Sequence, residues 1–168
     1  MSAVVVNWPF KVVQGGAAVN PPTVKAKAIS LLAQREYSRQ ELRDKLKAED
    51  ASLEEVEQAL AQLAAKGLVD DARVVETLVN RRAGKLGASR LRQELQAKGV
   101  SAELVAETMA DLKGTELARA QAVWQKKFGI LAASATDRNK QARFLASRGF
   151  SGELVRKIVS GLVDDSEQ

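Results

Sequence analysis

The sequence predicts an all-α fold: an elongated array of three tandem three-helix repeats, preceded by a non-helical N-terminal arm. Three observations lead to this prediction. The 168 residues are rich in the helix formers Leu, Ala, Glu, Lys, Arg and Gln, and only 4% of them are aromatic. Residue patterns that start helices recur along the chain. A set of apolar and capping residues also repeats at a nearly constant spacing, which is typical of repeat proteins.

The predicted arm comprises residues 1–22. It contains an apolar, partly alternating stretch that includes Trp8 and Phe10, and Pro21 and Pro22 interrupt the chain before any helix begins. Trp8 and Phe10 are the candidate anchors if this arm is a functional tail. We expect the arm to be either disordered or docked on the body of the repeats.

The first predicted repeat covers residues 23–69, and its first two helices begin at capping residues. Thr23 can cap a helix over 25–35. Ser38 and Glu41 form a capping box, in which each side chain accepts the backbone N–H of the other residue. The apolar residues expected on one face of the second helix are Leu42 and Leu46.

A second capping box, Ser52 with Glu55, is expected to open the third helix of this repeat. Gly67 is expected to end it. The apolar residues expected on one side of this helix are Leu53, Val56, Leu60 and Leu63.

The same residues recur at offsets of 49 and 50 along the chain. Equivalent sets are Leu46, Leu95 and Leu145; Ser52, Ser101 and Ser151; Val56, Val105 and Val155; and Leu63, Leu112 and Leu162. The expected caps of the middle helices, Ser38, Gly87 and Asp137, follow the same offsets. So many matches at one offset indicate a true internal repeat.

The second and third repeats are therefore expected over 70–113 and 114–163, with an acidic tail at 164–168. Their first helices are expected over 71–82 and 115–128. Glycine should end each middle helix, at Gly99 and Gly149.

The third repeat departs from the pattern in its middle helix. Gln141 stands where the other repeats have Leu42 and Leu91, so other residues are expected to supply the apolar face. These are Ala142, Phe144 and Leu145. Trp124, Phe128, Phe144 and Phe150 are interpreted as packing residues, with base stacking as the functional alternative for Trp124.

Composition narrows the classes of function. Cysteine and histidine are absent, which excludes disulfides, zinc–thiolate sites, thiol nucleophiles and imidazole bases. Any enzyme would have to work with carboxylates, lysine or hydroxyls alone, so an enzyme is the least expected class of function, and we expect no cofactor and no metal. Asp70 and Asp71 are adjacent and do not share a helix face, so we interpret Asp71 as the cap of the next helix. Without an apolar run near the roughly 20 residues of a membrane span, or a signal peptide, we expect a cytoplasmic protein with no membrane partner. We also expect a monomer.

The net charge of +5 permits an anionic partner, and the excess of basic residues belongs to the second and third repeats. The segment 80–100 contains six basic residues but only one acidic residue, Glu94. Gly84 and Gly87 should break the helix there, which leaves arginines on both sides of a turn. The predicted partner- or DNA-binding residues are Arg81, Arg82, Lys85, Arg90, Arg92, Lys98, Lys126, Lys127, Arg138, Lys140, Arg143 and Arg148.

Four segments carry a family resemblance. They are Ser38-Arg39-x-Glu41-Leu42-x-x-Lys45-Leu46, Gly67-Leu68-Val69-Asp70-Asp71-x-Arg73, Gly87-x-x-Arg90-Leu91-Arg92-x-Glu94-Leu95-x-x-Lys98-Gly99-Val100 and Phe144-Leu145-x-x-Arg148-Gly149-Phe150. In this order and at this spacing they resemble the signature segments of the RecX family of bacterial recombination regulators, over about residues 25 to 163. After Arg73 the chain has Val74-Val75, where the family usually has an aromatic and a small residue.

The resemblance implies a fold of three tandem three-helix repeats and a partner, the RecA recombinase filament on single-stranded DNA. RecX proteins bind this filament along its helical groove and limit its extension, which suppresses ATP hydrolysis, strand exchange and coprotease activity. The basic residues of the second repeat would then meet acidic filament residues or the DNA backbone, and binding to DNA alone would be weak.

Two other classes of function stay open. An independent DNA-binding module would use the helix from Ser89 as its recognition helix. A helical scaffold would keep its basic face in solvent and bind some other protein.

Overall fold

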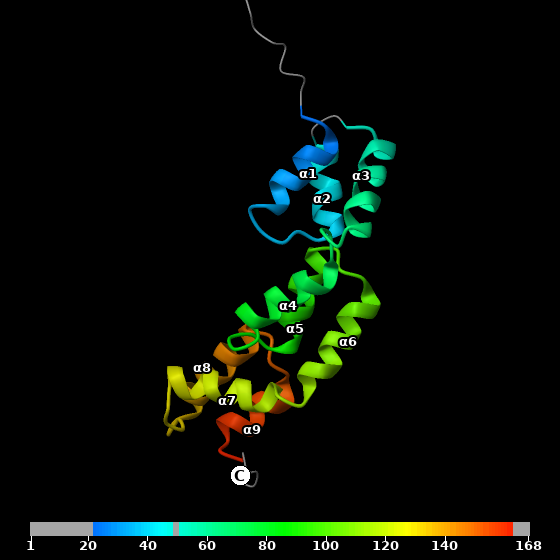
Figure 1. Cartoon of the computed structure of the whole chain (residues 1–168). Coiled ribbons are helices and arrows are strands. Elements are labelled where there is room, and N and C mark those ends of the chain that lie inside the picture. Colours follow the sequence, from blue (N-terminus) through cyan, green and yellow to red (C-terminus); the bar gives the residue numbers. More distant parts are fainter. Residues whose placement is uncertain (1–21, 49–50, 163–168) are drawn as a thin grey trace, which may run out of the picture.

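The computed structural model describes residues 22–48 and 51–162. Within these ranges the chain forms nine α-helices and no strand. Three groups of three helices follow one another along an elongated body (Figure 1). The predicted all-α array of three-helix repeats is confirmed. Residues 1–21 of the expected arm, which include Trp8 and Phe10, lie outside the described residues. The expected acidic tail lies outside them as well.

The first unit consists of α1 (Val24–Leu32), α2 (Arg39–Lys47) and α3 (Leu53–Ala65). Thr23 caps α1 as predicted, because its hydroxyl accepts the backbone N–H of Ala26 at 3.2 Å. The helix ends at Leu32, earlier than predicted. Arg35 lies in the following loop instead, where its guanidinium binds the carboxylate of Glu41.

Both capping boxes of the first unit are confirmed. Ser38 and Glu41 exchange hydrogen bonds of 3.1 Å, and Ser52 and Glu55 exchange bonds of 3.2 Å. Of the four apolar residues predicted on one side of α3, the three that are buried are Val56, Leu60 and Leu63. Leu53 is wrongly placed by that prediction: it is the first residue of α3, and 56% of its surface is exposed.

The second unit consists of α4 (Asp71–Arg82), α5 (Ala88–Ala97) and α6 (Ala102–Lys113). The bounds of α4 and the break between Gly84 and Gly87 are as predicted. Its cap is Asp70 and not Asp71, because the Asp70 carboxylate accepts the N–H of Ala72 at 2.9 Å. Leu91 and Leu95 of α5 are completely buried in the core of this unit.

The third unit consists of α7 (Glu116–Lys127), α8 (Ala135–Ser147) and α9 (Gly152–Val159). Helix α8 begins about one turn earlier than the repeat offset predicted, so Ser134 is its cap and Asp137 is a residue of its first turn. The equivalence of Leu162 with Leu63 also fails. Leu162 follows the end of α9 and is 73% exposed, because no helix continues to hold it on the inner face.

Gln141 occupies the inward position of the leucines that it replaces. It is only 5% exposed, and its side-chain oxygen accepts the indole N–H of Trp124 at 2.9 Å. Its amide nitrogen donates to the carbonyl of Ile130, also at 2.9 Å. The prediction that neighbouring apolar residues supply this face is correct for Leu145, which is buried. It did not foresee that Gln141 itself stays in the core, where its polar atoms are hydrogen-bonded.

Each unit has its own hydrophobic core. The helices α1, α2 and α3 pack together, as do α7, α8 and α9, while α5 contacts both α4 and α6 in the second unit. Trp124 and Phe150 belong to the third core, and Phe128 and Phe144 pack against it. The rings of Phe128 and Phe144 contact each other edge to face, with their centroids 5.1 Å apart. Separate cores mean that the path of the array depends on how the units are joined.

Candidate partner-binding surface and the unit junctions

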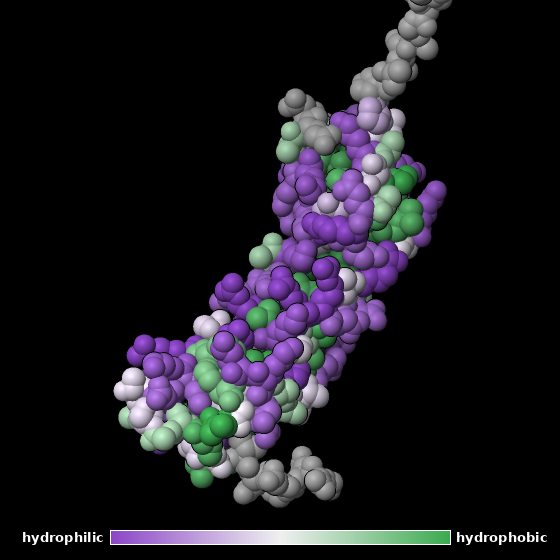
Figure 2. Space-filling model, turned by 90° about the vertical axis from the view of Figure 1, so that its left-hand side faces the viewer, coloured by the Kyte–Doolittle hydropathy of each residue, from purple (hydrophilic) through white to green (hydrophobic). Residues whose placement is uncertain are grey.

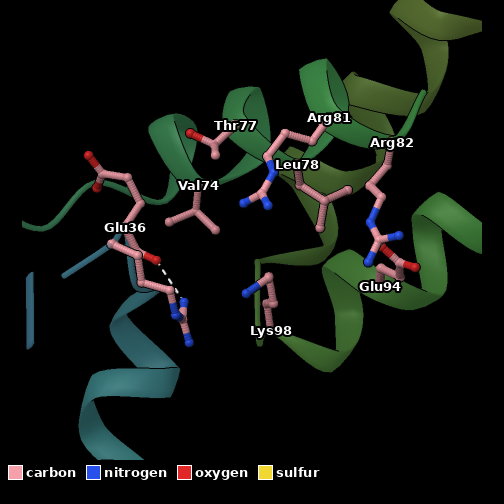
Figure 3. A pocket seen from close by; sticks show the side chains of 9 residues that line it. Glu36, Val74, Thr77, Leu78, Arg81, Arg82, Glu94 and Lys98 are labelled. Carbon is pink, nitrogen blue, oxygen red and sulfur yellow. Dashed lines mark hydrogen bonds and ion pairs between the residues drawn. The ribbon is translucent and has the colours of Figure 1, made fainter. Parts of the chain in front are cut away.

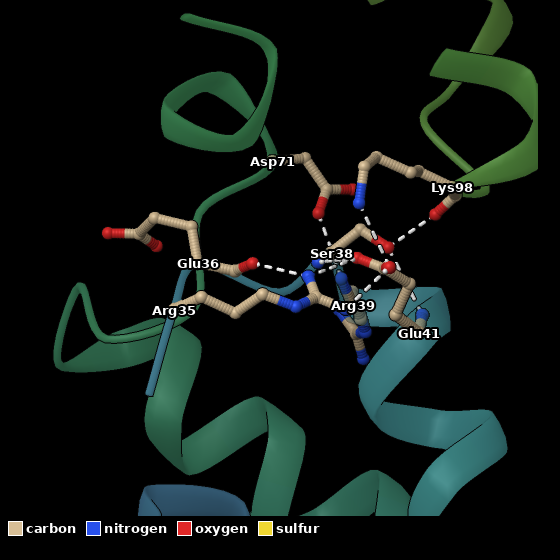
Figure 4. Close-up of polar contacts among 7 residues, drawn as sticks. All are labelled: Arg35, Glu36, Ser38, Arg39, Glu41, Asp71 and Lys98. Carbon is tan, nitrogen blue, oxygen red and sulfur yellow. Dashed lines mark hydrogen bonds and ion pairs between the residues drawn. The ribbon is translucent and has the colours of Figure 1, made fainter. Parts of the chain in front are cut away.

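The first and second units are joined at the N-terminus of α2 (Figure 4). The Ser38 hydroxyl donates a hydrogen bond to the carbonyl of Lys98, at the C-terminal end of α5. The backbone N–H of Arg39 donates to the carboxylate of Asp71 at 2.9 Å. The first N–H groups of a helix have no partner within it, so Asp71 supplies to α2 an acceptor from the next unit.

The second and third units are joined in the same manner at the N-terminus of α5. The N–H of Gly87 donates to the carbonyl of Arg148 at 2.9 Å, and the N–H of Ser89 to that of Gly149 at 3.2 Å. Between them, the N–H of Ala88 donates to the carboxylate of Glu116 at 2.9 Å. The N-termini of α2 and α5 thus each contact the turn and the acidic first-helix residue of the unit that follows.

Arg119 adds three further hydrogen bonds across the second junction. Its guanidinium donates to the carbonyls of Ala83 and Leu86, both at 2.8 Å, and to that of Leu112 at 3.3 Å. The carbonyls of Ala83 and Leu86 follow the C-terminal end of α4, and that of Leu112 lies in the last turn of α6. The last carbonyls of a helix have no partner within it, so they can accept hydrogen bonds from other groups. Arg119 therefore fixes the turn that carries the predicted basic residues.

Glu41 is the centre of an ion-pair network at the first junction (Figure 4). Its carboxylate lies 3.0 Å from Nη2 of Arg35 and 3.0 Å from Nζ of Lys98. Burial would raise the pKa of Glu41, but hydrogen bonds from Arg35, the Ser38 backbone and Lys98 outweigh it and hold that pKa at about 2. The Arg35 guanidinium also stacks 3.5 Å from the ring centroid of Tyr37.

A groove opens beside this network, between the α1–α2 loop and the second unit (Figure 3). Its volume is about 210 Å³. Apolar, charged and neutral polar side chains line it, namely Arg35, Glu36, Val74, Thr77, Leu78, Arg81, Arg82, Glu94 and Lys98. It therefore combines an apolar wall on α4 with an excess of cations.

Three of the predicted partner-binding residues line this groove: Arg81, Arg82 and Lys98. Arg81 is exposed and forms no ion pair within the described part of the chain. Arg82 lies 3.6 Å from Glu94, a long and exposed pair. Lys98 is half-buried and bound to Glu41, so much of its charge is used within the junction.

The other predicted residues of the second unit, Lys85, Arg90 and Arg92, are exposed on the α4–α5 turn and on α5. In the third unit, Lys126, Lys127, Arg138 and Arg143 are exposed as well.

Two predicted cations of the third unit have internal partners. Lys140 lies 2.8 Å from the carboxylate of Asp137, whose pKa is lowered by hydrogen bonds from Lys140 and Ser134. Arg148 lies 3.6 Å from the ring centroid of Phe144 and donates to its carbonyl at 3.2 Å. Like Lys98, Arg148 also belongs to a junction, through its own carbonyl.

Sequence reasoning missed the residues that join the units. Asp71 and Glu116 are each the first residue of the opening helix of their unit, so their equivalence was a detectable signal. The partner backbone groups on α2 and α5, and the target carbonyls of Arg119, had no signal in the sequence, because they are brought close only by the stacking of units.

The described residues offer no cluster of three or more carboxylates that could hold a metal ion. No helix among the same residues is both long enough and apolar enough to cross a membrane. Hydrophilic residues cover most of the face drawn in Figure 2, and smaller hydrophobic patches lie between them.

Comparison with known families identifies the repeats. The models of the first, second and third three-helix domains of RecX match residues 25–63, 70–109 and 115–159, respectively. Each match falls on one of the three helical units.

Similar proteins cover most of the chain. Regulatory protein RecX of Ralstonia nicotianae is 40% identical over 151 residues, which are 88% of this chain and 95% of the relative. Regulatory protein RecX of Acidithiobacillus ferrooxidans is 46% identical over 136 residues, which are 80% of this chain and 87% of the relative.

Solved structures share the fold. The crystal structure of RecX from Lactobacillus salivarius aligns with a TM-score of 0.69 at 18% identity, over 83% of this chain and 94% of that one. A second crystal structure of regulatory protein RecX aligns with a TM-score of 0.67 at 23% identity, over 82% of this chain and 73% of that one. The three matched domains and the extent of the identity establish that the chain belongs to the RecX family.

Proposed function

We propose that this protein is a non-catalytic regulator of the RecA recombinase. In this proposal it binds the RecA filament on single-stranded DNA along the helical groove and limits its extension. Inhibition of ATP hydrolysis, strand exchange and coprotease activity follows. The observation that carries the proposal is the match of all three units to successive RecX domains, together with relatives named as regulatory proteins.

The form of the molecule supports this proposal. An array of separate units presents a long surface that can contact several neighbouring subunits of a filament. The exposed Arg81, Lys85, Arg90 and Arg92 lie around the α4–α5 turn in the middle of the array. Arginine binds carboxylates and phosphates through two parallel hydrogen bonds, which suits either acidic filament residues or the DNA backbone.

The test is the rate of RecA ATP hydrolysis on single-stranded DNA, titrated with this protein from well below to equal molar amounts. A DNA-binding measurement without RecA, at the same salt concentration, is the control. We expect hydrolysis to fall at amounts of the protein below those of RecA, with weak binding to DNA alone. Unchanged hydrolysis with strong, salt-dependent DNA binding would contradict the proposal and favour an independent DNA-binding module.

A further inference from the structure

We propose that the groove between the first two units binds an acidic segment of a protein partner. In this inference one carboxylate of the segment pairs with Arg81 and a neighbouring apolar side chain packs on Val74 and Leu78. The inference rests on the proposed function for the identity of the partner, the RecA filament, but the chemistry of the groove can be tested without it.

The apolar part of the groove is the inner side of α4. Val74 and Leu78 are one helical turn apart and line the groove, and Thr77 is exposed beside them (Figure 3). Both residues are largely buried, with 3% and 7% of their surfaces exposed, and Leu78 belongs to the core of the second unit, so the wall is a narrow apolar strip in a fixed position. A wall of this kind favours an apolar side chain of the partner over solvent.

The cations of the groove are unequal in their availability. The Arg35 and Lys98 charges are shared with Glu41, and Arg82 has Glu94 nearby. Arg81 forms no ion pair within the described residues, and its guanidinium extends over the groove on the side that faces Lys98 (Figure 3). A carboxylate placed there gains two hydrogen bonds from Arg81.

The carboxylates of the groove favour a peptide over nucleic acid. Glu36 and Glu94 are among its lining residues, and Glu36 is itself held 3.3 Å from Arg73. A DNA strand carries a continuous row of phosphates, some of which would meet these carboxylates, and like charges in contact are unfavourable. A single acidic side chain beside an apolar one can use Arg81 and the α4 wall while avoiding them.

The groove chemistry is tested by titrating the full chain with short peptides under NMR observation. The probe is N-acetyl-Leu-Asp-Glu-Leu-amide, and its control has the same apolar residues with Asn and Gln in place of the acids. We expect the acidic peptide to shift the Val74 and Leu78 methyl signals and the Arg81 side-chain signal, and to bind about tenfold more tightly than its control. Equal binding of the two peptides, or tighter binding of oligothymidine at this site, would overturn the inference.

Two variants test the same groove independently. Thr77→Phe fills it from an exposed position, and Arg81→Gln removes the available cation. Each should weaken binding of the acidic peptide about tenfold. The matched control is Ala72→Phe, the same introduced ring at an exposed position of α4 that does not line the groove, and it should leave peptide binding unchanged.

Binding to RecA filaments separates this inference from the proposed function. If the unaltered protein binds filaments and Thr77→Phe and Arg81→Gln bind about tenfold more weakly, both proposals are supported. If all variants bind filaments equally well, the groove inference fails and the proposed function stands. If the unaltered protein does not bind filaments, the proposed function fails, and the peptide titration still decides what the groove accepts.

Discussion

The carboxylate of Glu116, in α7, accepts the backbone N–H of Ala88 at the start of α5, at a distance of 2.9 Å. Asp71 makes the equivalent bond to Arg39 at the start of α2, also at 2.9 Å. The same contact thus joins both pairs of consecutive units, although the two acidic residues differ. It places a negative charge at the positive end of a helix dipole while holding two units together.

Loss of the Glu116 carboxylate should therefore destabilise the second junction. We expect Glu116→Ala to lower the free energy of unfolding by about 2 kcal/mol, because Glu116 is buried and the Ala88 N–H loses its acceptor. Urea unfolding followed by circular dichroism measures this change. The control is Glu103→Ala, at an exposed first-turn position of α6, which should cost less than about 0.5 kcal/mol. Equal losses for the two variants would show that the bond across the junction contributes nothing.

Gly149 should tolerate no side chain. Its φ is +84°, and a Cβ there would lie 2.5 Å from the backbone nitrogen of Arg90. We expect Gly149→Ala to destabilise the protein by about 2 kcal/mol or more, through backbone strain and separation of the units. Gly84→Ala is the control, since Gly84 has no left-handed backbone and nothing within 4 Å of an added Cβ. A melting temperature that falls no further for Gly149→Ala than for Gly84→Ala would contradict this account.

Stability should fall in acid as Glu41 becomes protonated. Its pKa in the folded protein is about 2, below the ordinary value of 4.5, so its contribution is complete above pH 4.5 and is lost as the pH falls towards 2. Glu41→Gln should remove this part of the pH dependence and cost about 2 kcal/mol at neutral pH, through the lost ion pairs with Arg35 and Lys98, while the amide oxygen of glutamine can still accept the Ser38 N–H. Urea unfolding at several pH values measures both effects.

The control for Glu41 is Glu55→Gln, which alters the other capping box of the first unit. Among the described residues, no arginine or lysine pairs with the Glu55 carboxylate, so its replacement should cost less at neutral pH. A Glu41→Gln variant with an unchanged acid transition would show that the network with Arg35 and Lys98 is not the cause.

The buried pair of Trp124 and Gln141 should be coupled. Gln141→Leu restores the residue type of the other two units but leaves the indole N–H and the Ile130 carbonyl without partners. We expect a loss of about 1–3 kcal/mol for this change. A double-mutant cycle with Trp124→Phe measures the coupling by chemical denaturation, and additive losses would mean that the hydrogen bond contributes no stability.

Charge reversal around the α4–α5 turn should weaken regulation of RecA. We expect Arg81→Glu, Arg82→Glu and Lys85→Glu, made together, to reduce inhibition of ATP hydrolysis about tenfold or more with little loss of helicity, since all three residues are exposed. The control reverses Lys47 and Lys66, two exposed lysines of the first unit. Inhibition that survives the triple reversal would remove this turn from the binding surface.

The sequence predicted the helices well because the signals that start and stop them are local. Ser38 with Glu41, and Gly99 with its φ of +70°, act on residues within one or two turns, so their patterns could be interpreted without the fold. The errors are of the same local kind. A constant offset predicts Asp137 as a cap, whereas Ser134 caps the helix about one turn earlier, and the sequence predicts for Asp71 the role that its neighbour Asp70 performs.

The candidate surface was predicted less completely. The basic character of the second and third units follows from composition, and most of the predicted cations are indeed exposed. Which cations remain available could not be predicted, because ion pairs such as that of Lys98 with Glu41 join residues far apart in the chain. The sequence predicts both Lys98 and Arg81 as binding residues. Of these two, only Arg81 forms no ion pair within the described residues.

By itself, the sequence determined the helical class, the three repeats and the family resemblance, because these depend on periodicity, capping residues and spacing along the chain. Only the tertiary structure decided how the units stack, which residues join them and where a groove forms. The carboxylates of Asp71 and Glu116, the guanidinium of Arg119 and the apolar wall of α4 acquire their roles from neighbours that belong to other units. Such contacts depend on the relative positions of separate cores, which no local pattern records.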